Sequence, residues 1–95
     1  SMAEDQAHEA ASWYEDRQEG LGLVFWEELE NATALIRAYP YVNDKAAAGL
    51  YRMNLKRFPY FLLYAFNEEN LFVELILHAH VSNATIRRHI QQLKS

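Results

Sequence analysis

A chain of 95 residues is long enough for one domain but can bury only a thin core, and its net charge of −4 is modest. Hydrophobic residues make up 51% and charged residues 23%, which excludes a disordered tail, and the lack of cysteine excludes both a disulfide framework and a thiolate metal site. No apolar run approaches the roughly 20 residues of a membrane-spanning helix, and no signal peptide precedes the acidic start, so we expect a single cytoplasmic domain over residues 1–95.

Two helices are predicted in the N-terminal part of the chain. After Ser1, which indicates a cloning remnant, and the start methionine Met2, an alanine stripe predicts a helix over residues 3–19 that ends at Gly20. A second helix is predicted to end before Pro40, with an apolar stripe of Leu21, Phe25, Leu29, Ala32 and Ile36. Because only a short link separates the two helices, we expect an antiparallel hairpin. The solvated face of the second helix is expected to carry Glu27, Glu28 and Glu30.

The hydrophobic period changes from helical to alternating after a connection over residues 40–49. Residues 50–56 alternate between apolar and polar side chains and predict a strand with one buried face. Residues 57–66, RFPYFLLYAF, are apolar on both faces and predict a second strand, and residues 71–80, LFVELILHAH, predict a third. The turn NEEN joins the last two strands as a hairpin, so we expect a three-stranded antiparallel sheet.

The NEEN turn sets an expected register between the second and third strands. If Phe66 pairs with Leu71, then Leu62 lies opposite Leu75. One face of the second strand then forms the floor beneath the helix hairpin, through Tyr60, Leu62, Tyr64 and Phe66. The opposite face carries an apolar patch that is expected to bind a partner or to be covered, and it consists of Phe61, Leu63, Phe72 and Ile76.

A short helix is predicted at the C-terminus. Ser82 can cap it, and Ile86, Ile90 and Leu93 share one side, which we expect to fold over the apolar patch unless another chain does so. The fold class is therefore α+β, with an N-terminal helix hairpin packed on a three-stranded antiparallel sheet and a short C-terminal helix.

Several motifs follow one another in a specific order. GLG lies between the two predicted helices and is followed by Phe25, and RFPY leads into the strand that continues to Tyr64. A hairpin comes next, with His78 near the end of the last strand. In this order and spacing, residues 5–80 resemble the ParE branch of the RelE/ParE superfamily of bacterial toxin–antitoxin toxins.

The resemblance implies a toxin that acts by binding a protein, with a cognate antitoxin as its partner, DNA gyrase as its usual target and no cofactor. The chain departs from the family pattern in two places. The usual first strand is missing, which leaves a sheet edge that invites a strand from another chain. The sequence HAHVSN stands where family toxins often carry adjacent arginines and a proline turn. The candidates for target contact are Arg57, Arg87 and Arg88.

The charges are distributed unevenly along the chain. Residues 1–30 hold nine acidic side chains against one basic one, whereas residues 31–95 hold eight basic side chains against four acidic ones. The basic part could meet an acidic partner, while the acidic part would repel a nucleic acid. We therefore expect protein partners and no direct nucleic-acid binding.

Two other functions remain open, a non-toxic dimeric interaction module derived from the toxin fold and a RelE-like endoribonuclease. A ribonuclease needs a base, a cation and an acid around the scissile phosphate. The available polar site consists of His78, His80 and Glu74, with Arg52 or Lys56 on the neighbouring strand. The apolar patch argues against a phosphate site there, so no catalytic residue is expected. The two histidines are interpreted as polar surface residues, and no metal site is expected.

Overall fold

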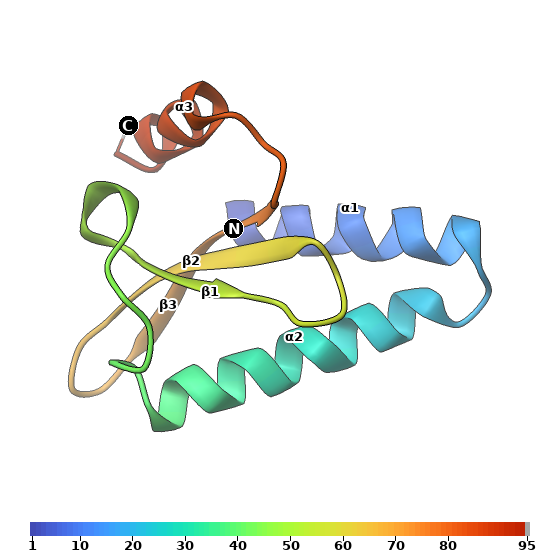
Figure 1. Cartoon of the computed structure of the whole chain (residues 1–95), viewed down its shortest axis with the longest axis horizontal. Coiled ribbons are helices and arrows are strands. Elements are labelled where there is room, and N and C mark those ends of the chain that lie inside the picture. The colour runs from blue at the N-terminus through green and yellow to red at the C-terminus, as the bar shows by residue number, and fades with distance from the viewer. Residues whose placement is uncertain (95) are drawn as a thin grey trace.

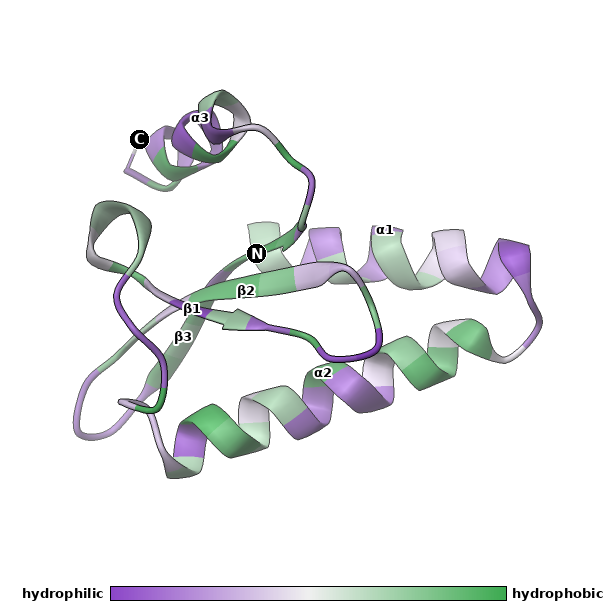
Figure 2. Cartoon of the chain, in the orientation of Figure 1, coloured by the Kyte–Doolittle hydropathy of each residue, from purple (hydrophilic) through white to green (hydrophobic). Residues whose placement is uncertain are grey.

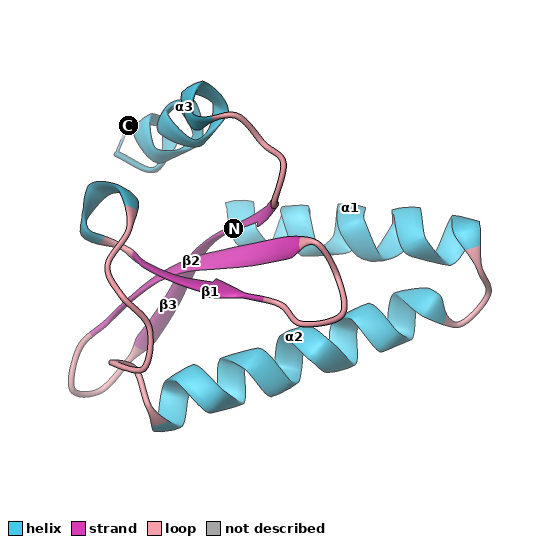
Figure 3. Ribbon diagram, in the orientation of Figure 1, coloured by secondary structure: helices cyan, strands magenta, loops and turns pink. Residues whose placement is uncertain are grey.

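Three helices and a three-stranded sheet make up the computed structural model, which describes residues 1–94 (Figure 1). In chain order the elements are α1 (Met2–Arg17), α2 (Leu21–Ala38), a 3-10 turn (Ala47–Gly49), β1 (Tyr51–Asn54), β2 (Tyr60–Phe66), β3 (Leu71–His78) and α3 (Asn83–Lys94). The strands are antiparallel in the order β1-β2-β3, with the α1–α2 hairpin packed on one face and α3 on the other (Figure 3). The predicted α+β class is confirmed.

Within residues 1–94 no helix combines the length and the apolar character that crossing a membrane requires.

The α1–α2 hairpin is held together by small side chains. The alanine stripe of α1 is buried as predicted, at Ala3, Ala7, Ala10 and Ala11. A Cβ atom added at Gly22 would lie 2.8 Å from the carbonyl oxygen of Ala11, so the close approach of the two helices requires glycine there. Gly20, with a φ of 87°, supplies the left-handed conformation of the turn.

The carboxylate of Glu15 closes the hairpin turn. Its oxygens accept hydrogen bonds from the backbone N–H of Gly20 at 2.9 and 3.1 Å and from that of Gly22 at 3.0 Å. These N–H groups lie at the start of α2, where no helical carbonyl is available to them and where a negative charge is favourable. Glu15 therefore acts as the cap that Gly20, which has no side chain, cannot provide.

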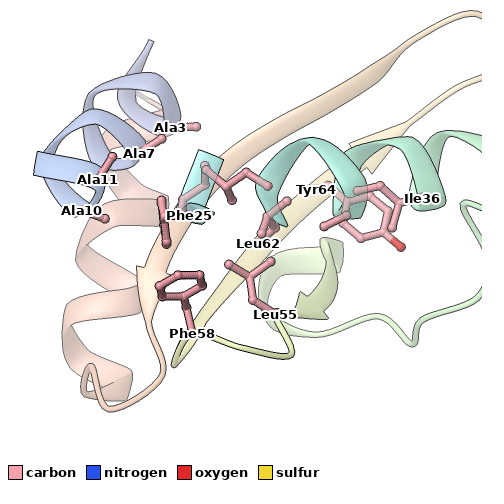
Figure 4. Close-up of a cluster of buried hydrophobic side chains, with 13 residues drawn as sticks. Ala3, Ala7, Ala10, Ala11, Phe25, Ile36, Leu55, Phe58, Leu62 and Tyr64 are labelled. Carbon is pink, nitrogen blue, oxygen red and sulfur yellow. The ribbon is translucent and has the colours of Figure 1, made fainter. Parts of the chain in front are cut away.

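The main core lies between the helix hairpin and the sheet. Phe25 and Ile36 of α2 are fully buried, as are Leu62 and Tyr64 of β2 beneath them (Figure 4). Phe58, from the β1–β2 turn, packs its ring edge to face against Phe25 with the centroids 5.1 Å apart. Hydrophobic residues continue along β2 and β3 (Figure 2), so the central strand has apolar neighbours on both faces, as its composition predicts.

Glu28 of α2 ties the β1–β2 turn to the helix hairpin. Its Oε1 accepts hydrogen bonds from the backbone N–H of Lys56 and of Arg57, both at 2.7 Å. The other carboxylate oxygen, Oε2, is buried. The prediction of a solvated helix face is therefore wrong for Glu28, because the turn folds back onto this part of α2, although Glu27 and Glu30 are exposed.

A β-bulge changes the register that the NEEN turn predicts. The pairs nearest the turn form as expected, and the register then shifts in the middle of β2, so that Glu74 of β3 has no partner. Beyond the bulge, Leu62 lies opposite Ile76 and not opposite Leu75. One extra residue in a strand moves every later side chain to the other face of the sheet.

The apolar patch predicted on the far face is therefore wrong in two of its four members. The buried cluster on that face consists of Phe61, Leu63, Leu75 and Leu77. Ile76 is instead buried on the side of the helix hairpin. Phe72 lies outside both clusters of buried residues and is 45% exposed.

α3 covers the far-face cluster, as its apolar side predicts. Ile90 is buried in the cluster, and Ile86 and Leu93 pack against it. The helix is capped by Ser82, whose Oγ accepts a hydrogen bond from the backbone N–H of Thr85 at 3.1 Å. The sheet is thus covered on both faces by the chain itself.

Candidate functional site

The three arginines that were expected to contact a target lie in two separate places. Arg57 lies in the β1–β2 turn beside α2, where its backbone N–H is bound by Glu28. Arg87 and Arg88 are exposed on α3, which packs on the opposite face of the sheet (Figure 1). The structure therefore does not combine Arg57 with the other two arginines in one site.

A groove beside α3 brings Arg87 together with Arg52 of β1. We call this hollow the arginine groove. It has a volume of about 420 Å³, and its lining includes the two arginines, the apolar side chains of Phe61, Leu63 and Ile86, and residues 46–48. None of the described residues that line it is acidic. An apolar floor with two guanidinium groups at its rim suits a segment that presents an apolar side chain next to a carboxylate.

Arg52 is held in place by two contacts. Its guanidinium carbon lies 3.8 Å from the centroid of the Phe61 ring, and its Nε donates a hydrogen bond to Oδ1 of Asn54 at 2.9 Å. Within residues 1–94 its two terminal nitrogens donate to no side chain or carbonyl. Arg52 is thus oriented by its neighbours while the donors that could bind a carboxylate stay free.

A second hollow, the α1 cleft, lies between α1, the start of β2, the end of β3 and α3. It has a volume of about 760 Å³, and its lining includes Glu9, Trp13, Tyr14, Tyr60, His78 and His89. Aromatic rings form much of its wall. The rings of Tyr14 and Tyr60 lie 6.1 Å apart, and those of Trp13 and Tyr14 lie 5.1 Å apart.

Glu9 is the one acidic side chain among the described residues that line the α1 cleft. Burial raises the pKa of Tyr60, and the negative charge of Glu9 raises it further. Burial also raises the pKa of Tyr14, with a further contribution from Tyr60. Both phenols are therefore neutral near pH 7.

The predicted polar site of His78, His80 and Glu74 is only partly assembled. The two imidazole rings lie 5.2 Å apart, and Nδ1 of His78 accepts a hydrogen bond from the backbone N–H of His80 at 3.1 Å. Glu74 sits at the bulge and does not line the α1 cleft. Sequence reasoning missed Glu9 and His89 as cleft residues. The available signal was the spacing of Glu9 and Trp13, which places both on one face of α1.

The residues that a ribonuclease would use are divided between the two faces of the sheet. His78 packs against Tyr60 on the side of the helix hairpin, with ring centroids 5.2 Å apart. Arg52 lies against Phe61 on the side of α3. Lys56 lies in the β1–β2 turn. No group of three or more histidine and carboxylate side chains within residues 1–94 is placed to hold a metal ion.

The missing first strand predicts an open edge of the sheet, and one of the two edges, the outer side of β3, is partly covered by α1. Oε1 of Gln6 accepts a hydrogen bond from the backbone N–H of Ile76 at 2.8 Å. This side chain satisfies a donor that an added strand would otherwise take.

Comparison of the chain with protein-family models, with curated proteins and with solved structures gives no match. The geometry of the arginine groove therefore carries the functional proposal.

Proposed function

We propose that the chain is a protein-binding domain that acts in the cytoplasm as the toxin of a bacterial toxin–antitoxin pair of the ParE-like kind. An antitoxin neutralises it, and DNA gyrase is the first candidate for its target. The observation that carries the proposal is the arginine groove, in which Arg52 and Arg87 lie beside apolar side chains and none of the described lining residues is acidic.

The groove fits a protein surface better than a nucleic acid. Phe61, Leu63 and Ile86 line it, and the half-buried Ile86 keeps apolar surface that a partner's side chain can cover, whereas a phosphate would have to lose its hydration beside these side chains. Guanidinium groups bind carboxylates in pairs of parallel hydrogen bonds, which fixes the orientation of an acidic partner. Arg88 is exposed on the same helix and adds to the positive charge of α3.

The proposal is tested by expressing the chain in bacteria and following growth. We expect growth arrest that overproduction of gyrase relieves. Arg87→Ala should weaken the arrest at equal protein level, because one of the two groove cations is lost. The matched control is Arg37→Ala, which removes an exposed arginine from α2, outside the groove, and should leave the arrest unchanged.

A second candidate function is a non-toxic interaction module that forms dimers. It is favoured by an exposed apolar group where α2 ends, in which Tyr39 is 64% exposed, Tyr41 76% and Val42 60%. Normal growth together with stable dimers in solution would support this function against the first. Cleavage of RNA by the purified protein, lost on His78→Ala, would contradict both.

A further inference from the structure

The α1 cleft is not used by the proposed toxin surface, and its composition points to a ligand of its own. We propose that the α1 cleft binds the guanidinium group of an arginine side chain presented by a partner protein. The inference does not depend on the arginine groove or on toxicity.

Glu9 brings an unpaired carboxylate to the wall of the α1 cleft. Its carboxylate has no ion-pair partner within residues 1–94, and none of the described residues that line the cleft is a lysine or an arginine. The charge reaches the interior of the cleft, because it raises the pKa of the Tyr60 phenol. An incoming cation would therefore meet an attractive potential at the cleft wall.

Aromatic rings line the α1 cleft together with Glu9. Trp13, Tyr14 and Tyr60 surround the same hollow, and a ring face attracts a cation most strongly where water is partly excluded. Trp13 already binds a cation, since the guanidinium carbon of Arg17 lies 4.2 Å from its ring centroid. Arg17 does not line the cleft, so the rings of Tyr14 and Tyr60 stay available to a second guanidinium beside the occupied ring of Trp13.

The planar shape of a guanidinium suits a cleft that combines one carboxylate with aromatic rings. A guanidinium is planar, it stacks on aromatic rings and it pairs with one carboxylate through two hydrogen bonds, so one group can satisfy Glu9 and the rings at once. The cleft lies on the part of the chain with the acidic excess, where α1 carries Glu4, Asp5, Glu9, Glu15 and Asp16 against Arg17. A basic protein partner is thus attracted to this side before the side chain enters the cleft.

The test is an NMR titration of the isotope-labelled chain with the peptide acetyl-Gly-Arg-Gly-amide. The indole N–H of Trp13 is the reporter, and that of Trp26, which packs against His8 outside the cleft, is the internal reference. We expect saturable shifts at Trp13 with a Kd of about 1–10 mM, as is usual for a single side chain, and an unmoved Trp26. The same peptide with citrulline has the same shape without the charge and should bind about tenfold more weakly or not at all.

Two variants sharpen the titration. Glu9→Gln should weaken binding of the arginine peptide about tenfold, which corresponds to the loss of one charge-assisted contact. Glu27→Gln, an exposed change of equal charge on α2, should leave the Kd within about twofold. Both sites are exposed, and the dispersion of the amide spectrum verifies that each variant is folded. The inference is overturned if the citrulline peptide binds equally well, if Glu9→Gln has no effect, if Glu27→Gln is equally damaging, or if Trp13 does not respond.

Discussion

The hydroxyl of Tyr64 fixes the path of the long connection between α2 and β1. Tyr64 is fully buried, and its hydroxyl donates a hydrogen bond to the carbonyl oxygen of Pro40 at 3.0 Å and accepts one from Nδ2 of Asn43 at 3.2 Å. The connection has little regular structure of its own, so these contacts anchor it to the core. Because residues 46–48 form one wall of the arginine groove, the anchor also helps to shape that groove.

Replacing Tyr64 by phenylalanine removes both hydrogen bonds and leaves the ring in place. We expect the free energy of unfolding to fall by about 1–2 kcal/mol, because two partly buried polar groups lose their partner. Urea denaturation measures the change. Tyr51→Phe is the matched control, since no hydrogen bond from the half-buried Tyr51 hydroxyl is formed within residues 1–94, and it should cost less than about 0.5 kcal/mol. Equal losses for the two variants would show that the Tyr64 hydroxyl is not the anchor.

At the scale of the elements, charged side chains connect one helix or turn to the next element that packs against it. Glu15 joins the end of α1 to the start of α2, and Glu28 joins α2 to the β1–β2 turn. In both cases a carboxylate accepts hydrogen bonds from two backbone N–H groups, which are stronger bonds than those between neutral partners. The turn that carries Phe58 into the core is therefore fixed from the helix side.

Glu28→Ala tests this connection. Both hydrogen bonds to the turn are lost, so we expect the free energy of unfolding to fall by about 2 kcal/mol. The neighbouring change Glu27→Ala removes an exposed carboxylate and should stay within about 0.5 kcal/mol of the parent chain. Thermal unfolding followed by circular dichroism compares the two variants. An unchanged melting temperature for Glu28→Ala would remove the role assigned to the carboxylate.

The elements differ in how far their sequences specify them. The alanine stripe of α1 and the apolar stripe of α2 repeat at helical spacing, so local sequence suffices to predict both helices. The bulge at Glu74 has no such local signal, because either register places apolar side chains on both faces of β2 and β3. Packing against α1 and α3 selects one register, which is why the register predicted from the turn places Ile76 and Leu75 on the wrong faces.

At the scale of the whole molecule, the sheet is the layer between two surfaces of different charge. The α1 side is acidic, whereas α3 carries Arg87, Arg88 and Lys94 and no acidic residue. α3 also closes the second apolar cluster, so its position decides both the burial of Phe61 and the presence of the arginine groove. The interaction surfaces therefore depend on the docking of one short helix.

Ile90→Asp tests whether the docking of α3 shields the sheet. A carboxylate at this position is buried without a partner, so we expect α3 to detach from the sheet. The face that carries Phe61 and Leu63 is then exposed and should cause the chain to self-associate. Light scattering on a sizing column measures the resulting increase in molecular mass. Leu23→Asp places the same group at a residue that is 64% exposed on α2 and should leave the chain unaffected. If both variants keep the parent chain's molecular mass and stability, α3 does not cover the sheet in solution.

Hydrophobic period and turn residues close by in the chain specify the class of the fold, the order and type of its elements and the helix hairpin, but they leave both α3 and a second chain as candidates to cover the far face of the sheet. Tertiary structure alone decided the bulge, the role of Glu28 and the composition of both hollows. Arg52 and Arg87 line one hollow, and Glu9 and Tyr60 line the other, although the members of each pair are far apart in the sequence. The packing of whole elements decides which side chains share a hollow, and this packing depends on the entire chain at once.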